Sequence, residues 1–374
     1  MPKILIITND FPPRVGGIQS FLHTVAMQLS KDVAVYAPAW RDATSFDRSL
    51  PFPVFRHPTS LMLPVWTVRR RALAIMAGEG CDSILFGAAA PLGLLAPALR
   101  RAGARRMVAI THGHEAGWAA VPLARGLLRH IGDSVDAVTY LGDYFHRRLA
   151  DTLSPAAAAR MRRLGPGVDT ERFRPGCGGA IVRARLGLGT RPVILCVSRL
   201  VPRKGQDMLI RAMPMVLKAV SEAVLVLVGE GPYAGKLRRL ARRLGLGRHV
   251  LFTGEISGEE LPAYYDAADI FAMPCRTRRA GLDVEGLGIV FLEAAASGLP
   301  VIAGDSGGAP DAVLEGETGF VVSGRDLQGL ADRLKRLLVD PALAKTMGTR
   351  GRAWVEGSWS RDVLGRSLRE LLEL

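Results

Sequence analysis

Short apolar runs, often rich in β-branched residues, recur along this chain and alternate with longer segments of helical character. The first run spans residues 3–8, where four consecutive aliphatic residues predict a strand buried on both faces. Similar runs follow in two series, at 33–37, 83–86, 107–111 and 137–141, and then at 192–197, 223–228, 249–253, 270–273, 301–303 and 319–322. Strands that alternate with helices predict an α/β fold built on doubly wound parallel sheets.

The chain is long enough for two domains, since 374 residues exceed the usual size of one. Glycine and proline are concentrated between Gly165 and Gly189, where the strand–helix alternation pauses, and this stretch predicts a linker and hinge. We therefore expect two Rossmann-like domains, over residues 1–172 and 173–356. The last helical segment, 357–374, is expected to pack back on the first domain.

The charge balance points to an acidic partner. The chain has 49 Lys and Arg against 35 Asp and Glu, a net charge of +14, with 48% apolar residues. This composition excludes a disordered chain or a fibre and favours contact with nucleic acid, anionic lipid or phosphorylated substrates. Only 6% of the residues are aromatic and no recognition motif is present, which argues against nucleic acid.

The excess of basic residues is largest in the N-terminal half, where residues 1–175 hold 22 Lys and Arg against 13 Asp and Glu. An apolar stretch, 61–66, is followed by Arg69, Arg70 and Arg71. This segment is either an amphipathic surface for anionic lipid or a solvated helix face. The longest uncharged run, between Asp82 and Arg100, is short and interrupted by Gly and Pro, so we expect a strand, loop and helix there rather than a membrane span.

The four cysteines are widely spaced and form no C-x-x-C pair. Neither a disulfide framework nor a zinc site is therefore implied, and a reducing, cytoplasmic setting is expected.

The loop after the first predicted strand contains Gly16 and Gly17 at the start of a helical segment. Glycines at a helix start let backbone N–H groups approach a phosphate, which the helix dipole also favours. The G-x-G-x-x-G dinucleotide motif is absent. The alternative is a tight turn that simply requires glycine.

Two cations, Arg199 and Lys204, follow the first strand of the predicted second domain. Ligands of open α/β sheets bind at the carboxyl ends of the strands. There the two side chains could hold a diphosphate, unless they form only a solvated basic turn.

Two glutamates, Glu285 and Glu293, bracket a glycine-containing helix start, Gly286-Leu287-Gly288-Ile289-Val290. The free N–H groups of a helix start can bind an anion, and a carboxylate near them can bind sugar or ribose hydroxyls. Glutamates near a helix start are otherwise merely stabilising.

The segment Thr111-His112-Gly113-His114-Glu115 ends another predicted strand. Its histidines either ligate a metal or form hydrogen bonds in a cleft. The spacing is not H-E-x-x-H, and the chain contains no D-x-D pair that could hold a cation, so we expect no metal.

Taken together, these four motifs resemble those of the retaining glycosyltransferases of family 4, and the resemblance covers nearly the whole chain. It implies the GT-B fold, in which two Rossmann-like domains face an interdomain cleft. The segments NDFPPRVGGIQ, THGHE, VSRLVPRKGQD and CRTRRAGLDVEGLGIVFLEA are similar to those of actinobacterial mannosyltransferases. Those enzymes transfer mannose from GDP-mannose to phosphatidylinositol mannoside.

The resemblance also implies the site residues. Catalysis is assigned to His112, Glu285, Arg199 and Lys204. Donor binding is assigned to Gly16, Gly17, Arg199, Lys204, Ile256, Gly286, Leu287, Gly288, Ile289, Val290 and Glu293. Acceptor contacts are assigned to Asp10, Gln19 and Arg71.

The implied partners are a nucleotide sugar, a glycolipid acceptor and an anionic membrane surface at the inner face of the plasma membrane, with neither cofactor nor metal. Two alternatives stay open: a family 4 transferase that uses another nucleotide sugar or a soluble acceptor, and a nucleotide-sugar epimerase. One departure from the family pattern is the basic run Arg276-Thr277-Arg278-Arg279, which replaces a turn of small residues and could contact a phosphate.

Overall fold

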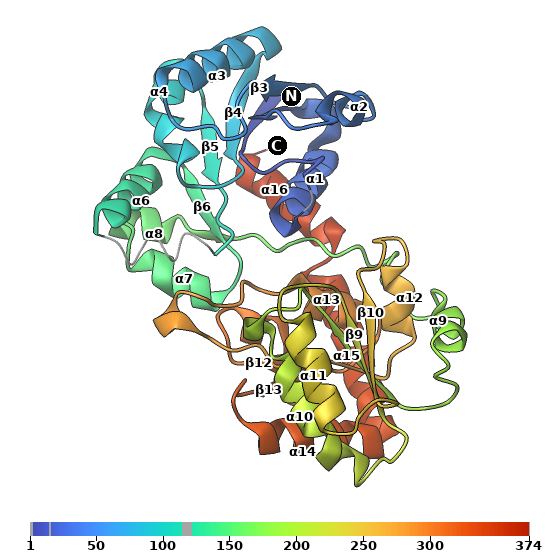
Figure 1. Ribbon diagram of the computed structural model, residues 1–374. Helices are drawn as coiled ribbons and strands as arrows, with labels where there is room; N and C mark the ends of the chain where they lie inside the picture. Colours follow the sequence, from blue (N-terminus) through green and yellow to red (C-terminus); the bar gives the residue numbers. More distant parts are fainter. Residues whose placement is uncertain (1–2, 15, 114–121, 374) are drawn as a thin grey trace. The chain divides into compact units, whose positions relative to one another are not determined.

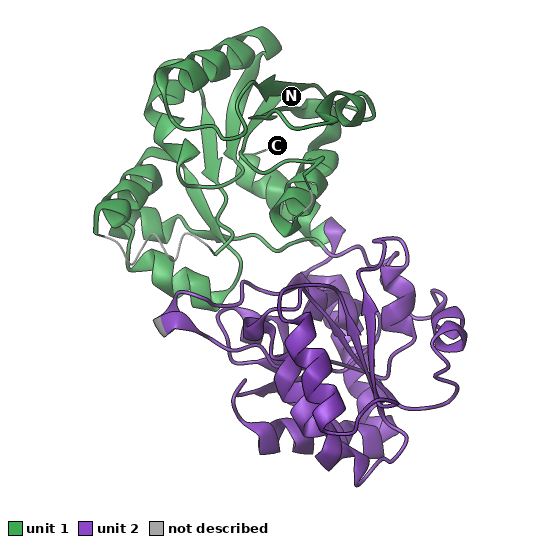
Figure 2. Ribbon diagram, viewed as in Figure 1, with its two compact units in different colours: residues 1–167, 362–374 green, residues 168–361 purple. Residues whose placement is uncertain are grey.

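The computed structural model describes residues 3–14, 16–113 and 122–373, and the chain divides into two compact units (Figure 2). Unit 1 comprises Met1–Gly167 and Asp362–Leu374, and unit 2 comprises Val168–Arg361. The boundaries expected after residues 172 and 356 thus lie after 167 and 361. The reason is local pairing: Val168 forms a parallel bridge with Ser360, and its N–H donates to the Trp359 carbonyl at 2.7 Å.

Unit 1 contains a parallel sheet with the strand order β3-β2-β1-β4-β5-β6-β7 (Figure 1). Its strands are β1 (Lys3–Ile7), β2 (Val33–Pro38), β3 (Val54–His57), β4 (Cys81–Phe86), β5 (Arg106–Ala109), β6 (Ala137–Tyr140) and β7 (Arg162–Arg163). Its helices are α1 (Gly17–Leu29), α2 (Ala43–Arg48), α3 (Trp66–Glu79), α4 (Ala96–Arg101), α6 (Pro122–Ser134), α7 (Asp143–Ala150), α8 (Pro155–Ala159) and α16 (Arg361–Leu372).

The sheet of unit 1 is covered by apolar side chains on both faces, which explains the uninterrupted apolar strands. Side chains of α3 contribute to the cluster on one face, and side chains of α1 and α16 contribute to the cluster on the other. In the second cluster Leu364 and Leu368 of α16 are buried together with Leu22 and Val25 of α1. The last helix is therefore part of the core of unit 1, although the chain reaches it only after unit 2.

Unit 2 contains a second parallel sheet, with the order β10-β9-β8-β11-β12-β13. Its strands are β8 (Val193–Val197), β9 (Val224–Val228), β10 (Val250–Gly254), β11 (Ile270–Met273), β12 (Val301–Gly304) and β13 (Gly319–Val322). Its helices are α9 (Gly179–Arg185), α10 (Gln206–Leu217), α11 (Ala234–Arg243), α12 (Leu261–Asp266), α13 (Ile289–Ala296), α14 (Leu327–Val339) and α15 (Pro341–Ser358). The expected α/β class is confirmed in both units.

The predicted linker between Gly165 and Gly189 was wrong in extent, because most of it belongs to unit 2 and contains α9. The N–H groups of Gly176 and Gly179 each donate to the Asp266 carboxylate at 2.7 Å. A Cβ on Gly179 would lie 2.5 Å from the Asp266 backbone. This glycine therefore permits close packing on α12 rather than flexibility.

The longest uncharged run forms a buried strand, β4, followed by a loop and α4, as the sequence predicts. Within the part of the chain that the structure describes, no helix combines the length and apolar character needed to cross a membrane.

Candidate active site

Most of the residues predicted to bind a donor belong to unit 2, whereas Gly16 and Gly17 lie in unit 1. All strands of the unit 2 sheet run parallel, so the loops that follow them leave from the same edge. Arg199 and Lys204 follow β8, Ile256 follows β10, and Glu285 lies in the loop between β11 and α13. Unit 2 therefore brings Arg199, Lys204, Ile256 and Glu285 to one edge of its sheet.

Lys204 and Glu285 form a buried ion pair across this edge. The Lys204 Nζ lies 2.9 Å from Oε1 of Glu285 and 2.8 Å from Oε2, but it is aligned as a hydrogen-bond donor only to Oε1. The two side chains are only 12% and 6% exposed. Gly205 fixes the turn after Lys204, since it has φ of 77° and a Cβ there would lie 2.0 Å from the Pro274 carbonyl oxygen. This pairing was not predicted from the sequence.

The loop after β12 holds the backbone of Glu285. The Glu285 N–H donates to Oγ of Ser306 at 3.1 Å, and the Gly308 N–H donates to the Glu285 carbonyl at 3.2 Å. Gly307 has φ of 57°, and a Cβ on it would lie 2.0 Å from that same carbonyl oxygen. Ser306 therefore positions Glu285. The signal that could have found it is a Ser-Gly-Gly turn at a strand end.

The backbone of Arg199 is held by a hydrogen bond, and its side chain is exposed to solvent. Gln206, which is fully buried, donates through Nε2 to the Arg199 carbonyl at 3.1 Å and to Oγ of Ser198 at 2.9 Å. The Arg199 side chain is exposed and forms neither a hydrogen bond nor an ion pair with any residue that the structure describes. An unpaired guanidinium held in this way is suited to bind an incoming oxyanion.

The start of α13 supplies backbone donors beside Glu285. Gly288, at φ of 76°, precedes the first helical residue, Ile289, and no side chain caps the helix. The first N–H groups of such a helix lack intrahelical partners and can bind an anion. Gly286 and the buried Leu287 lie in the loop before this start, and Val290 lies in its first turn.

Glu293 lies farther along α13 and is held by Tyr265 of α12. The Tyr265 hydroxyl donates to Oε2 of Glu293 at 2.9 Å. Burial raises the pKa of Glu293 to about 7, and the Tyr265 hydrogen bond partly opposes this rise. Tyr265 was missed at the sequence level, because a fully buried aromatic in an apolar pattern is typical of a core residue.

In unit 1, three of the predicted residues lie in contact after β1. The buried Gln19 donates through Nε2 to Oδ1 of Asp10 at 2.7 Å. A Cβ on Gly16 would lie only 2.1 Å from Oε1 of Gln19, whereas a Cβ on Gly17 would meet nothing. Gly16 therefore leaves room for the buried glutamine, and Gly17 begins α1 in open space.

His112 and Arg71 occupy different parts of unit 1. His112 follows β5, where its Nε2 lies 2.5 Å from the Gly87 carbonyl and its ring packs edge-on against Phe21 of α1. Arg71, on α3, lies over the ring of Phe55 in β3, with 5.8 Å from the guanidinium carbon to the ring centroid. The structure therefore brings His112 to α1 and places Arg71 against β3.

The other members of the possible metal site, His114 and Glu115, lie outside the described residues. Across 3–14, 16–113 and 122–373, no three His, Cys, Asp or Glu side chains are grouped so that they could hold a metal ion.

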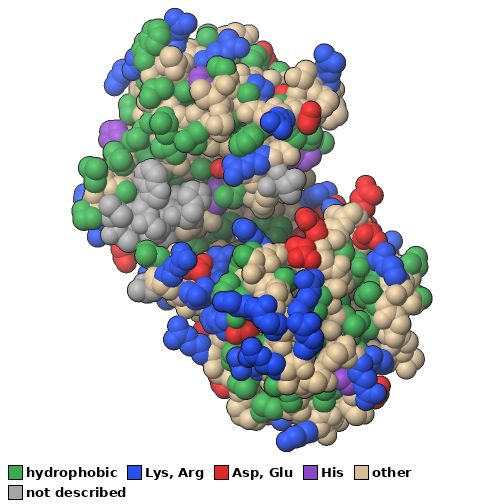
Figure 3. Space-filling model, viewed as in Figure 1, with side chains coloured by type: hydrophobic (Ala, Val, Ile, Leu, Met, Phe, Trp, Pro, Cys, Tyr) green, Lys and Arg blue, Asp and Glu red, His purple; other side chains and the backbone are tan. Residues whose placement is uncertain are grey.

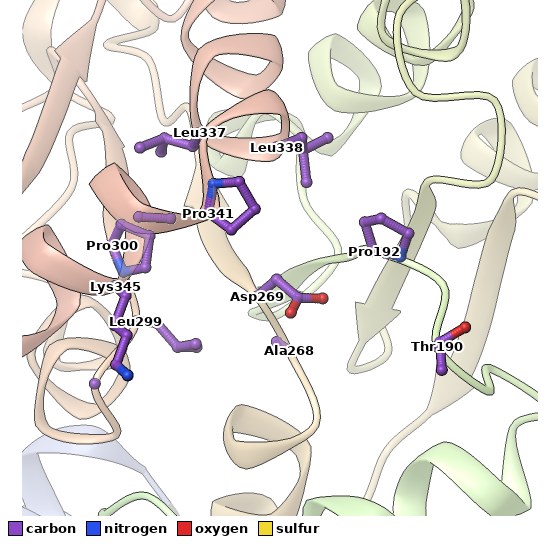
Figure 4. Close-up of a pocket in the computed structure, with 12 residues that line it drawn as sticks. Thr190, Pro192, Ala268, Asp269, Leu299, Pro300, Leu337, Leu338, Pro341 and Lys345 are labelled. Carbon is purple, nitrogen blue, oxygen red and sulfur yellow. The ribbon is translucent and has the colours of Figure 1, made fainter.

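A separate pocket of about 300 Å³ lies at the opposite edge of the unit 2 sheet (Figure 4). It is lined by residues that precede strands, such as Pro192, Asp269 and Pro300. The Asp269 carboxylate is already bonded to the Val193 N–H at 2.7 Å and to Arg183 at 2.9 Å. None of the predicted site residues lines this pocket, so it is not the candidate site.

Solved structures share this fold. HepE from Anabaena aligns over 99% of both chains with a TM-score of 0.83 at 20% identity. Sucrose-phosphate synthase from Thermosynechococcus elongatus aligns over 100% of this chain and 98% of its own, with a TM-score of 0.78 at 24% identity. These likenesses show that the chain shares the fold of both proteins, with two α/β units.

Sequence comparisons are more specific. The family model for glycosyltransferase family 4 matches residues 15–172, and that for glycosyl transferases group 1 matches 181–354. A mannosyltransferase of Mycolicibacterium smegmatis is 52% identical over 99% of this chain and 98% of its own. A relative from Mycobacterium tuberculosis is 50% identical over 100% of this chain and 98% of its own. Both are named GDP-mannose-dependent alpha-(1-6)-phosphatidylinositol monomannoside mannosyltransferase. With two family models that together match most of the chain and full-length relatives at this identity, the chain belongs to glycosyltransferase family 4.

Proposed function

We propose that this glycosyltransferase moves mannose from GDP-mannose to a phosphatidylinositol mannoside, with retention of the anomeric configuration. The observation that carries the proposal is 50–52% identity, over essentially the whole chain, to two enzymes named for this donor and acceptor. A Corynebacterium glutamicum relative, 46% identical over 99% of this chain, is named for the monoacylated form of the acceptor.

In this proposal the unit 2 edge binds the donor. Arg199 and Lys204 hold the diphosphate, and Glu285 with the amides from Gly286 to Val290 holds the transferred sugar and the distal phosphate. Glu293 accepts hydrogen bonds from the ribose hydroxyls, and the backbone of Ile256 contacts the base. The exposed Arg199 and the uncapped start of α13 support this assignment.

Charge placement suits the departure of a nucleoside diphosphate. As the bond to the sugar breaks, negative charge grows on the diphosphate, and cations fixed in advance stabilise it without reorganisation. The sugar becomes oxocarbenium-like, and the acceptor hydroxyl attacks on the same face while a leaving phosphate oxygen takes its proton. Glu285 is a poor nucleophile here, because Lys204 neutralises it at 2.8 Å. We propose that no metal takes part, since Arg199 supplies a positive charge that is not paired with any described residue.

Unit 1 is proposed to serve the acceptor and the reacting sugar. Gly16 and Gly17 would lie over the phosphates, and His112 would hydrogen-bond the sugar near the reacting carbon. Asp10, Gln19 and Arg71 are the proposed acceptor contacts. The hydrogen bond between Gln19 and Asp10 supports this role, because it fixes both side chains beside the glycine loop.

The acceptor is a membrane lipid, and unit 1 carries a surface suited to the membrane. Leu61, Leu63, Val65 and Trp66 are 56%, 48%, 50% and 58% exposed, and Arg70 lies 4.7 Å over the Trp66 ring. Apolar residues beside exposed arginines favour an anionic lipid surface. We propose peripheral binding at the cytoplasmic face of the plasma membrane, where a reducing environment suits the four free cysteines.

Asn9 keeps this exposed segment in place. Its side chain donates to the Met62 carbonyl at 2.9 Å and accepts from the Met62 N–H at 2.7 Å. The proposed membrane segment is thus tied to the loop after β1, which also carries Asp10. A lipid headgroup that reaches this segment would arrive beside the proposed acceptor contacts.

The full chain, labelled GDP-mannose and vesicles containing phosphatidylinositol mannoside test the proposal directly. We expect label in the lipid fraction, and little release of free mannose when the acceptor is omitted. Transfer only from UDP-sugars, or only to soluble inositol phosphates, would overturn the proposed substrates. Donor turnover without any acceptor would instead indicate an epimerase, and salt-sensitive DNA binding without donor binding would indicate a nucleic-acid protein.

A further inference from the structure

Another pocket of unit 2 lies at the carboxyl edge of its sheet, and arginines make it strongly basic. It has a volume of about 380 Å³ and lies where the chain leaves three neighbouring strands, β11, β12 and β13. It is lined by Arg276, Thr277, Arg278, Arg279, Gly281, Asp305, Ser323 and Arg325. This edge is where ligands of open α/β sheets bind, and the volume suits a small polar ligand.

Two of the four arginines that line the pocket are engaged within the protein. Arg276 donates to Oδ1 of Asp207 at 2.8 Å, and both side chains are largely buried. Arg278 lies 3.9 Å from an Asp283 oxygen, at the limit of an ion pair, while its backbone pairs with that of Asp283. Arg276 therefore anchors the loop, and Arg278 is only weakly neutralised.

The other two arginines carry uncompensated charge. Arg279 is exposed and forms neither a hydrogen bond nor an ion pair with any part of the chain that the structure describes. Arg325 is also exposed, and among the described residues it donates only to the Thr277 carbonyl, at 3.4 Å. The single carboxylate in the lining, Asp305, accepts the Gly324 N–H at 3.1 Å. The pocket thus has an excess of positive charge with guanidinium groups open to solvent.

The pocket is joined by a hydrogen bond to Ser306, the residue that positions Glu285. The Thr277 hydroxyl lies 3.2 Å from the Ser306 hydroxyl, which in turn accepts the Glu285 N–H. The loop that carries Arg276, Arg278 and Arg279 is therefore held in place, and its arginines stay close together. Guanidinium groups held close together prefer phosphate, which accepts two parallel hydrogen bonds from each fork.

We propose that Arg278, Arg279 and Arg325 form a binding site for a phosphate group, separate from the donor diphosphate site at Arg199 and Lys204. The phosphate is carried either by a phospholipid headgroup or by a free phosphate ion. The site does not depend on which sugar nucleotide the enzyme uses, so it stands apart from the proposed function.

Two probes and a matched pair of double variants test this site in the full chain. One probe is inorganic phosphate, followed by ³¹P line broadening with saturating GDP present to occupy Arg199 and Lys204. The other is flotation with phosphatidylinositol–phosphatidylcholine vesicles, compared with phosphatidylcholine alone. The test variant is Arg279→Gln with Arg325→Gln. The control, Lys345→Gln with Arg350→Gln, removes two exposed cations from α15.

We expect the test variant to weaken binding of at least one probe by tenfold or more, and the control to stay within twofold of the wild type. A loss confined to phosphatidylinositol vesicles identifies a lipid headgroup as the source, and a loss confined to inorganic phosphate identifies the free ion. Unchanged binding of both probes in the test variant, or equal losses in test and control, would overturn the proposal. Mannosyl transfer is measured separately, so a failure of the proposed activity remains distinguishable.

Discussion

The carboxyl edges of the two sheets use their polar side chains in different ways. In unit 1, Asn9 binds the Met62 backbone, Gln19 binds Asp10, and the Tyr36 hydroxyl lies 2.7 Å from Nδ1 of His57. In unit 2, the equivalent edge exposes the unpaired Arg199 and buries oxygens without aligned donors on Glu285 and Gln206. The first edge uses its polar side chains to hold its own loops together, whereas the second leaves charge and hydrogen-bonding capacity unused within the described chain. Similar folds can therefore use the same topological position in different ways.

The basic surfaces differ between the units as well. In unit 1 the exposed arginines of α3 follow exposed apolar residues, which suits a lipid surface. In unit 2, Lys and Arg side chains gather over α11 (Figure 3), which has five basic residues and no acidic one. The larger net charge of the N-terminal half therefore does not mean that the strongest local charge lies there.

The largest effect is expected from breaking the buried pair of unit 2. Lys204→Ala leaves the Glu285 carboxylate buried without its partner. Arg203, at 3.7 Å, is then the one cation within ion-pair distance among the described residues. We expect kcat/KM to fall about 10³-fold through the lost preorganised charge, and the free energy of unfolding to fall by about 3 kcal/mol. Initial rates and urea denaturation measure the two losses.

A neutral version of the pair separates these losses. The double variant Lys204→Met with Glu285→Gln removes both charges while keeping the side-chain volumes, so it should regain most of the unfolding free energy and none of the activity. Recovery of the rate in this double variant would show that the Lys204–Glu285 pair stabilises the fold and has no role in catalysis. Near-wild-type rates in Lys204→Ala would remove Lys204 from the site.

The next effect compares one arginine from each unit. Arg199→Gln should raise the KM for GDP-mannose about 10- to 100-fold, as expected for a lost charge-assisted hydrogen bond, without changing the unfolding midpoint. Arg56→Gln should do the opposite, because Arg56 binds Asp47 at 2.7 and 3.0 Å and also the Pro12 and Pro38 carbonyls. We expect it to lose about 2–3 kcal/mol of stability, with KM nearly unchanged. If the two arginines behave alike, the contrast between the edges fails.

A smaller effect is expected at the glycine loop of unit 1. In Gly16→Ala the new methyl group displaces the Gln19 amide and breaks its bond to Asp10, so we expect about a tenfold loss of kcat/KM. Adding Gln19→Ala to Gly16→Ala removes the side chain with which the new methyl group collides. If Gln19 contacts the acceptor, this double variant stays as impaired as Gly16→Ala alone. Full recovery in the double variant would show that Gln19 only fills space.

The smallest effect concerns the pH dependence of donor binding. The pKa of Glu293 is about 7 and the Tyr265 hydrogen bond lowers it, so Tyr265→Phe should raise it further. The protonated acid is the poorer acceptor for ribose hydroxyls, so KM rises as the pH falls through this pKa. We expect the acid limb of the KM profile to move to higher pH by up to about one unit, with kcat nearly unchanged. A uniform change of KM at all pH values would indicate a packing effect instead.

Most strands could be predicted because a parallel strand buried on both faces is an uninterrupted apolar run. β3 and β7 could not: β3 is a half-buried edge strand between prolines and polar residues, and β7 consists of two exposed arginines. Their pairing is decided by the neighbouring strands β2 and β6, which local sequence does not reveal.

Individual candidate residues could be proposed from the sequence because they follow predicted strands. Their partners could not, because those lie far away in the chain. Lys204 and Glu285 are 81 positions apart, and nothing local indicates that their charges meet. Tyr265 has an apolar context, and only the structure shows that its hydroxyl reaches Glu293.

The position of α16 has a consequence for how the protein is made. Leu364, Leu368, Leu371 and Leu372 complete the core of unit 1, yet the ribosome adds them after all of unit 2. Unit 2 is continuous in the chain and can close its sheet as soon as it emerges. The half synthesised first is therefore the half that finishes folding last. Until α16 has been added, Leu22 and Val25 of α1 lack the leucines that share their core cluster.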